Sequence, residues 1–316
     1  MPAFLTHKIA ADNIRAQIED PAVRSLIDGA EDAYYSGAQG GDYFYSYKYY
    51  SMWAGHRYKM FGWALHRTRP QRFFVEGSEW LRDHPSEKGK AFFLGYVTHY
   101  ALDMYVHPLV IGLAGRDMKE HNRVESALDC MYAQRNGVDA WSFDRAQFIR
   151  DTYVETDEID TFFQAMMDRL YVGFTLPPRP YRTTYAYFAD FHGMLQDESL
   201  RSRLWMRIRD VFTILKTRTL LYRPADVIAD AYDYDTFFAR IDTASAHALR
   251  MISAVTRFWS GQGDITGIQS VFYNINMNGT PITPIEERRR FRQLYKQAPL
   301  VRSEPGRIRS TKTAKK

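Results

Sequence analysis

The sequence predicts an all-α protein, and three observations support that fold class. Apolar residues recur at spacings of three and four along much of the chain, whereas strand patterns are scarce. Helix start and stop signals accompany the periodic segments. The 316 residues, 45% hydrophobic and 25% charged, have the composition of a globular protein. We therefore expect a multi-helix globular domain.

The helical period recurs in six segments. Within the first segment, Asp20-Pro21 opens a helix and Asp28-Gly29 closes it. Pro85-Ser86-Glu87 has the composition of a helix's first turn and precedes the second segment. The six segments are residues 9–27, 91–106, 124–132, 162–172, 204–221 and 237–259.

Three stretches interrupt this pattern. Residues 37–42 are rich in glycine and are predicted to form a flexible loop. The Pro-Pro-Arg-Pro run at 177–180 is the clearest break in mid-chain, and residues 261–284 are predicted to be irregular. Residues 286–316 hold eleven Lys or Arg and three Glu, so the net charge of +5 comes from this tail. We expect the tail to be disordered, although its Arg-rich start is compatible with a short helix.

Composition excludes several classes of protein. With Cys130 as the single cysteine, the chain can form neither an internal disulfide nor a thiolate zinc finger, so nitrogen and oxygen must supply any metal ligands. The N-terminus has no basic segment followed by an apolar run, and no stretch approaches eighteen apolar residues. We therefore expect a cytoplasmic protein without a transmembrane helix.

Two clusters of histidines and acids carry the chemical signal. His99, Asp103 and His107 stand four residues apart, and so do His121 and Glu125. Side chains at this spacing project from one helix face. Pro108 is expected to place His107 near the end of its helix. Imidazole with carboxylate is normal zinc coordination.

An isolated His–acid pair is more often a surface ion pair or a packed core histidine. Two pairs within 27 residues, both inside apolar helices, favour a metal site. An acid such as Asp103 among apolar residues is expensive to bury without a counter-charge, and a bound cation supplies one. Manganese or iron also fits nitrogen and oxygen ligands.

The order of these motifs resembles the zinc-dependent phospholipase C family, which is all-helical and holds zinc ions at the bottom of a cleft. The resemblance covers residues 1–135. It rests on Thr6-His7, Gly40-Gly41-Asp42, His56, His99…Asp103…His107 and His121…Glu125.

The resemblance implies two or three zinc ions. The first would be held by Asp42, His56, His99 and Asp103, and the second by His107, His121 and Glu125. His7 would share Asp103 with a third ion. It also implies that Asp42 is the candidate general base. On this interpretation residues 1–175 are the catalytic domain, 176–285 a helical extension packed on it, and 286–316 the basic tail.

The resemblance implies a phosphodiester hydrolase that releases a phosphorylated headgroup from a phospholipid with metal-activated water. Two alternatives stay open: a cytoplasmic phosphoesterase acting on nucleotides or small esters, and a helical protein that holds zinc without catalysis. The basic tail suggests peripheral contact with anionic lipid, and nucleic acid is a less favoured partner. The sequence gives no oligomeric state.

The remaining histidines lie outside the family pattern. We expect His66 and His84, each beside a charged residue, to face solvent, His192 to line a cleft, and His247 to pack in the core. The aromatic run at residues 43–53 would suit a choline-like headgroup through cation–π contacts. Packing against neighbouring helices explains the run equally well.

Overall fold

A computed structural model of the chain describes residues 4–51, 55–115, 117–171, 174–176, 178–212, 217–223 and 231–297. Within these ranges the regular structure is helical, apart from one antiparallel bridge between Ile275 and Pro281. The prediction of an all-α fold is therefore confirmed. None of the described helices is long and apolar enough to cross a membrane.

The described helices are distributed over both halves of the chain. The first half of the chain forms α1 (Phe4–Ala16), α2 (Pro21–Asp28), α3 (Glu31–Ala38), α4 (Tyr43–Ser46), α5 (His56–Arg67), α6 (Pro70–Asp83), α7 (Glu87–Ala114) and α8 (Met118–Arg135). The second half forms α9 (Arg145–Asp151), α10 (Glu158–Leu170), α11 (Pro180–Gln196), α12 (Leu200–Phe212), the 3-10 helix η1 (Thr217–Leu220), α13 (Tyr234–Trp259), α14 (Ile265–Val271) and α15 (Pro284–Gln297).

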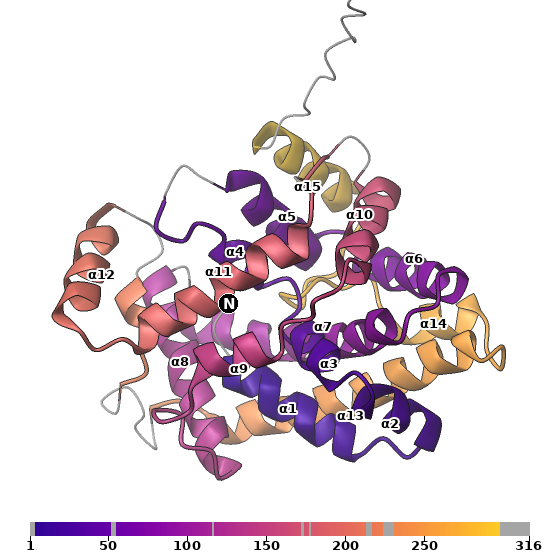
Figure 1. Cartoon of the computed structure of the whole chain (residues 1–316), viewed down its shortest axis with the longest axis horizontal. Helices are drawn as coiled ribbons and strands as arrows, with labels where there is room; N and C mark the ends of the chain where they lie inside the picture. Colours follow the sequence, from indigo (N-terminus) through magenta and orange to yellow (C-terminus); the bar gives the residue numbers. More distant parts are fainter. Residues whose placement is uncertain are drawn as a thin grey trace, which may run out of the picture.

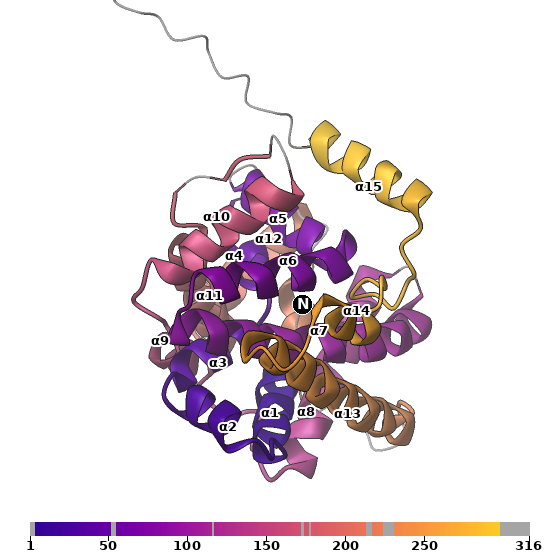
Figure 2. The ribbon, with the colours of Figure 1, turned by 90° about the vertical axis from the view of Figure 1, so that its right-hand side faces the viewer.

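Helix α7 is the central element. It packs against α1, α3, α8 and α13, and the views in Figures 1 and 2 show these helices around it. Apolar residues occur on all sides of it, as expected for a buried helix, and most of its residues from Ala91 to Val106 are buried. The side chain of Ser86 accepts a hydrogen bond from the backbone N–H of Gly89 and so caps its first turn.

One hydrophobic core joins the two halves of the chain. It contains residues of α1, α3, α7 and α10 together with residues of α11 and α13. Helices α11, α13, α14 and α15 thus pack into the same core as the helices before residue 176. Met206 of α12 belongs to a smaller cluster with Phe191, Leu195 and Leu220. Helix α15 lies at the edge of the molecule in Figure 2, where Arg69 and the ring of Phe291 form a cation–π contact.

The structure corrects two local expectations and bears on a third. Residues 37–42 are not a flexible loop: Gly37 belongs to α3, and residues 37–42 are buried. The segment 261–284 contains α14 as well as irregular turns. At the start of the basic tail, the short helix that its Arg-rich segment allows is present as part of α15, while residues 298–316 lie outside the described part of the chain.

Pro108 does not end its helix, because α7 continues to Ala114. Proline lacks an N–H group, so it leaves the carbonyl of Met104 without its helical partner. The turn at Gly279 packs against this position, where an added Cβ would lie 2.3 Å from the Pro108 ring and 3.0 Å from the Met104 oxygen. His107 therefore stays on the same helix face as Asp103.

Two glycines allow α3 and α7 to touch through their backbones. A Cβ on Gly95 would lie 2.0 Å from the carbonyl oxygen of Tyr34, and one on Gly37 would lie 1.9 Å from that of Phe92. Real Cβ contacts are never this short, so any side chain here would push the helices apart. This approach holds the Gly-rich turn after α3 close to α7.

We predict that Gly95→Ala destabilises the protein by about 1–3 kcal/mol, because overpacking forces the two helices apart. Gly112→Ala on the same helix is the matched control, since nothing lies within 4 Å of the added Cβ. Its expected effect is a gain of about 0.5–1 kcal/mol. Urea unfolding of both variants measures the difference, and equal stabilities would contradict the close packing of α3 on α7.

Candidate metal centre

Helix α7 carries three polar side chains on one buried stripe. His99, Asp103 and His107 lie one turn apart, and Asp103 Oδ2 is 3.3 Å from His99 Nε2 and 3.7 Å from His107 Nδ1. His99 is fully buried and Asp103 is only 4% exposed. The sequence prediction that these three side chains share one face is therefore confirmed.

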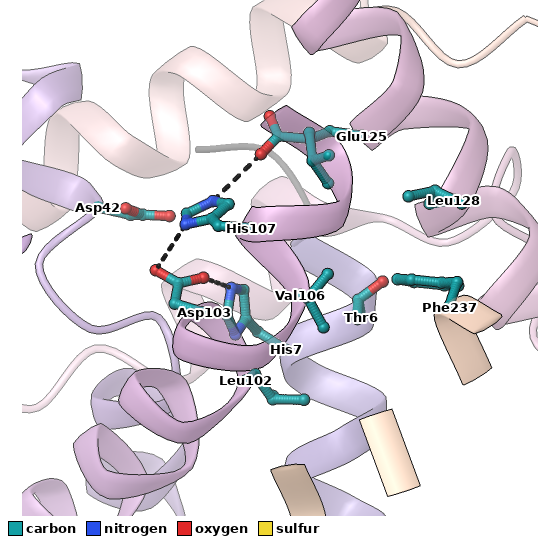
Figure 3. Close-up of a pocket in the computed structure, with 11 residues that line it drawn as sticks. Thr6, His7, Asp42, Leu102, Asp103, Val106, His107, Glu125, Leu128 and Phe237 are labelled. Carbon is teal, nitrogen blue, oxygen red and sulfur yellow. Dashed lines mark ion pairs between the residues drawn. The ribbon is translucent and has the colours of Figure 1, made fainter. Parts of the chain in front are cut away.

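Helix α8 supplies the second pair. Glu125 Oε1 lies 3.1 Å from His121 Nε2 and 3.3 Å from His107 Nε2, so it joins the two helices. Figure 3 shows His107 between Glu125 on one side and Asp103 on the other. The His107 ring is fixed from outside the cluster, since its Nδ1 lies 2.8 Å from the carbonyl oxygen of Met277.

His7 reaches the cluster from α1, with its Nε2 atom 3.3 Å from Asp103 Oδ1 and its ring stacked on His99. The buried carboxylate of Asp129 on α8 holds the first turn of α1 in place. It accepts hydrogen bonds from the backbone N–H groups of Leu5 and Thr6, and from the hydroxyl of Tyr222. No local pattern singles out Asp129, because its role depends on this contact with residues more than a hundred positions away.

The turn after α3 brings Asp42 to the opposite side of the cluster, where its Oδ1 atom lies 2.9 Å from His66 Nε2. Gly40 makes this approach possible. It has a positive φ of 58°, and an added Cβ would lie 2.1 Å from the His99 ring. The glycine-rich segment is therefore a close-packed support for His99.

His66 replaces His56 in the arrangement that the sequence predicts. His56 is exposed at the first residue of α5 and belongs to none of the described groups of potential ligands. Ten helical residues, about 15 Å, separate it from His66. The prediction that His66 faces solvent is wrong. His66 is 6% exposed and continues the buried row of Tyr58 and Gly62 at a spacing of four residues.

Potential ligand atoms gather in three groups, each with atoms within 4.8 Å of one another. The groups are His7, His99 and Asp103; Asp42, His66 and His99; and His107, His121 and Glu125. The structure thus brings together seven of the eight residues singled out from the sequence, all except His56.

The charges in the cluster favour ionised carboxylates. Burial opposes the ionisation of Asp103, but His107 and His99 outweigh it and hold the pKa of that carboxyl well below its usual range. Burial and the neighbouring His99 lower the pKa of His7. Burial also lowers the pKa of His107, but Asp103 and Glu125 outweigh it and raise that pKa to about 9. His107 must therefore release a proton before it can bind a metal.

The buried atoms fit a metal. Both ring nitrogens of His99 and Oδ2 of Asp103 lack a hydrogen-bond partner among the described residues. Zinc bonds of about 2.0–2.1 Å in a tetrahedron place neighbouring ligand atoms about 3.3 Å apart. The nitrogen–oxygen separations of 3.1–3.3 Å around Asp103 and Glu125 match this value.

The orientation of His66 also fits. Its Nδ1 lies 2.7 Å from the carbonyl oxygen of Gly62, the usual outer contact of a metal-binding histidine. If Nδ1 donates its proton there, Nε2 presents a lone pair to the Asp42 carboxylate. Two acceptors 2.9 Å apart require a cation, either a proton or a metal ion, to hold them together.

His84, His192 and His247 belong to none of the three ligand groups. His247 is fully buried and lies within hydrogen-bond distance of Tyr105 and the carbonyl of Val271, as expected for a core residue. His84 is exposed and stacks on Trp80. His192 lines a cavity beside Asp42.

The aromatic run at residues 43–53 is packed at its start, where Tyr43 and Phe44 are buried in the core. Residues 52–54 lie outside the described ranges.

Comparison with known families agrees with this geometry. Residues 6–171, just over half of the chain and including all three ligand groups, match the family described as zinc dependent phospholipase C. No curated protein and no solved structure gave a significant match.

We predict that His66→Gln lowers the zinc content by one ion per chain, because it removes a ligand next to Asp42 and His99. His56→Gln is the matched control and should bind as much zinc as the unaltered protein. Elemental analysis of both purified variants measures this. Zinc loss in His56→Gln alone would restore the ligand set that the sequence suggested.

Proposed function

Because the chain belongs to the zinc-dependent phospholipase C family, we propose that it hydrolyses phosphodiesters, with a phospholipid as substrate and two or three zinc ions as cofactors. The products would be a lipid alcohol and a phosphorylated headgroup. The observation that carries the proposal is the buried cluster of three ligand groups, with Asp42 at its edge.

Bound zinc would neutralise the phosphodiester, activate a water molecule and stabilise the leaving oxygen. His107, His121 and Glu125 would hold one ion. Asp42, His66 and His99 would hold another, and His7 and Asp103 would complete the cluster. Their nitrogen and oxygen ligands leave positions open for water and substrate, as in catalytic sites.

Asp42 is the proposed general base. Burial opposes its ionisation, but positive charge in its surroundings and the hydrogen bond with His66 lower the pKa of Asp42, and His99 and His66 contribute to that charge. His66 lies next to Oδ1, so Oδ2 is the oxygen that would accept a proton from the attacking water. Asp42 lines the same cavity as His7, Asp103 and His107 (Figure 3).

The other wall of this cavity favours a lipid over a nucleotide. It is apolar, formed by Leu102, Val106, Val110, Leu128 and Phe237. A wall without donors or acceptors offers nothing to a nucleobase or ribose, so it favours a lipid ester over a nucleotide.

We predict that the zinc-loaded chain releases diacylglycerol from a short-chain phospholipid, and that Asp42→Asn lowers kcat by about 10²–10⁴-fold, the range for loss of a general base. Asp83→Asn, at an exposed ion pair, is the control and should keep full activity. Chromatography of the lipid products gives the rate.

Two results would contradict the proposal. Hydrolysis of nucleotide or small phosphodiesters without any of phospholipid would favour the cytoplasmic phosphoesterase. Full zinc content with no hydrolysis of any phosphodiester would favour a non-catalytic zinc protein.

A further inference from the structure

A second cavity lies on the other side of Asp42. Its polar lining residues besides Asp42 are Gln39, Arg145 and His192, and its apolar ones are Phe4, Phe188, Phe191, Leu195 and Leu220. Asp42 also lines the cavity with the metal ligands, so the proposed general base borders both cavities.

Polar atoms in the lining of this second cavity are buried without a hydrogen-bond partner. Gln39, Arg145 and His192 are 2%, 3% and 4% exposed. Gln39 Nε2, Arg145 Nε and His192 Nδ1 have no hydrogen-bond partner in the described part of the chain. Two of these three atoms, those of Gln39 and Arg145, are obligatory donors. Burial and the charge of Arg145 hold the pKa of His192 well below its usual range, so its ring is neutral.

Arg145 is the most unusual member of this set. Its backbone N–H donates to Gln196 and its guanidinium lies 4.1 Å from the centre of the Tyr222 ring. Within the described ranges the guanidinium forms no ion pair. A buried cation costs several kcal/mol unless an anion accompanies it. Apart from the Asp42 carboxylate on its border, the cavity thus presents one positive charge and buried donors without partners, in a space of about 10 Å³ that its side chains would have to widen for a ligand.

We propose that this cavity binds a second anionic group of the substrate, a carboxylate or a phosphate carried by the headgroup. This inference rests on the proposed function and names the substrate class: phospholipids with an anionic headgroup. A trimethylammonium group would be repelled by Arg145. The choline-like headgroup suggested by the aromatic run therefore does not suit this cavity.

The test compares ligands that differ by one anionic group. O-phosphoserine equals phosphoethanolamine plus a carboxylate, and glycerol 1,3-bisphosphate equals glycerol 1-phosphate plus a phosphate. Calorimetry on the zinc-loaded chain should show at least tenfold tighter binding of the anionic member of one pair. Arg145→Met should abolish that preference with unchanged zinc content and no fall in Tm, and Arg145→Lys should keep part of it.

Arg135→Met is the matched control, because this exposed arginine lies over the ring of Phe238 at a similar distance of 4.2 Å. It should keep the preference. Equal affinities within both pairs, or a preference that survives in Arg145→Met, would overturn the anion site. Elemental analysis of the same samples separates this outcome from a failure to bind zinc, which would count against the proposed function.

An independent observation concerns α12, which projects from the edge of the molecule in Figure 1. Its apolar residues Leu200, Leu204, Ile208 and Val211 are 88%, 58%, 54% and 74% exposed. At 100° per residue they fall within an arc of about 80° on one face. Large apolar side chains gathered on one exposed stripe indicate an interaction surface.

The rest of the helix shows what this stripe faces. Ser202 and Met206 are buried on the opposite side, so the stripe points away from the protein. Arg201 and Arg207 flank it and are exposed. An apolar stripe bordered by arginines is the pattern of a helix that lies in the interface of an anionic membrane.

We infer that α12 docks the protein on an anionic phospholipid surface. Helix α12 packs on η1, and Leu220 at the end of η1 lines the second cavity. Docking through α12 would therefore bring the region of the proposed site to the lipid. This inference assigns to α12 the membrane contact that the sequence suggested for the basic tail.

Sedimentation with vesicles tests the docking. The chain should bind vesicles of phosphatidylcholine mixed with phosphatidylglycerol, and bind pure phosphatidylcholine more weakly. The double change Leu204→Ser and Ile208→Ser should weaken binding at least tenfold, without affecting hydrolysis of a monomeric short-chain lipid. Ile285→Ser, at an exposed position of α15, is the control and should bind normally.

Unchanged vesicle binding in the double variant would overturn the inference. So would a dimer in solution that the double variant converts to a monomer, because the stripe would then be covered by a second copy. Both readouts are independent of turnover, so they do not depend on the proposed reaction.

Discussion

The arrangement of the site depends on one buried carboxylate. Asp103 is almost inaccessible to solvent, and four imidazoles surround it: His7, His66, His99 and His107. An ionised carboxylate at such a position costs several kcal/mol unless positive charge compensates it. The histidines compensate it partly, and their own ring nitrogens then need partners. Divalent cations satisfy both requirements at once, which explains why so many titratable groups share one interior.

The surrounding fold serves to bring these ligands together from separate helices. Helix α7 is buried on most sides, and glycines at its contact with α3 let the Gly40 turn reach His99. Asp129 fixes the start of α1 and with it His7. None of these supporting residues is expected to touch a metal. They determine whether ligands more than a hundred residues apart in sequence meet within a few ångströms.

The local part of this arrangement could be predicted from the sequence, and the long-range part could not. Spacings of four residues placed His99, Asp103 and His107 on one face because the helical period is a local property. The choice between His56 and His66 depends on where α5 begins and how it packs, which no local pattern specifies. The same applies to Arg145, whose position beside Asp42 results from the packing of α9 on α11. Pro108 was misleading because a tertiary contact at Gly279 accommodates it within the helix.

The two cavities that Asp42 borders would bind different parts of the substrate. One offers metal ligands and an apolar wall, and the other offers buried donors and a cation. These roles require metal ions at the three ligand groups.

Anomalous X-ray diffraction at the zinc edge, on crystals of zinc-loaded protein, shows directly whether the ligand groups bind zinc. We expect two or three zinc peaks, one between Asp42, His66 and His99 and one between His107, His121 and Glu125. Zinc peaks only at surface positions, with the buried cluster holding none, would contradict it.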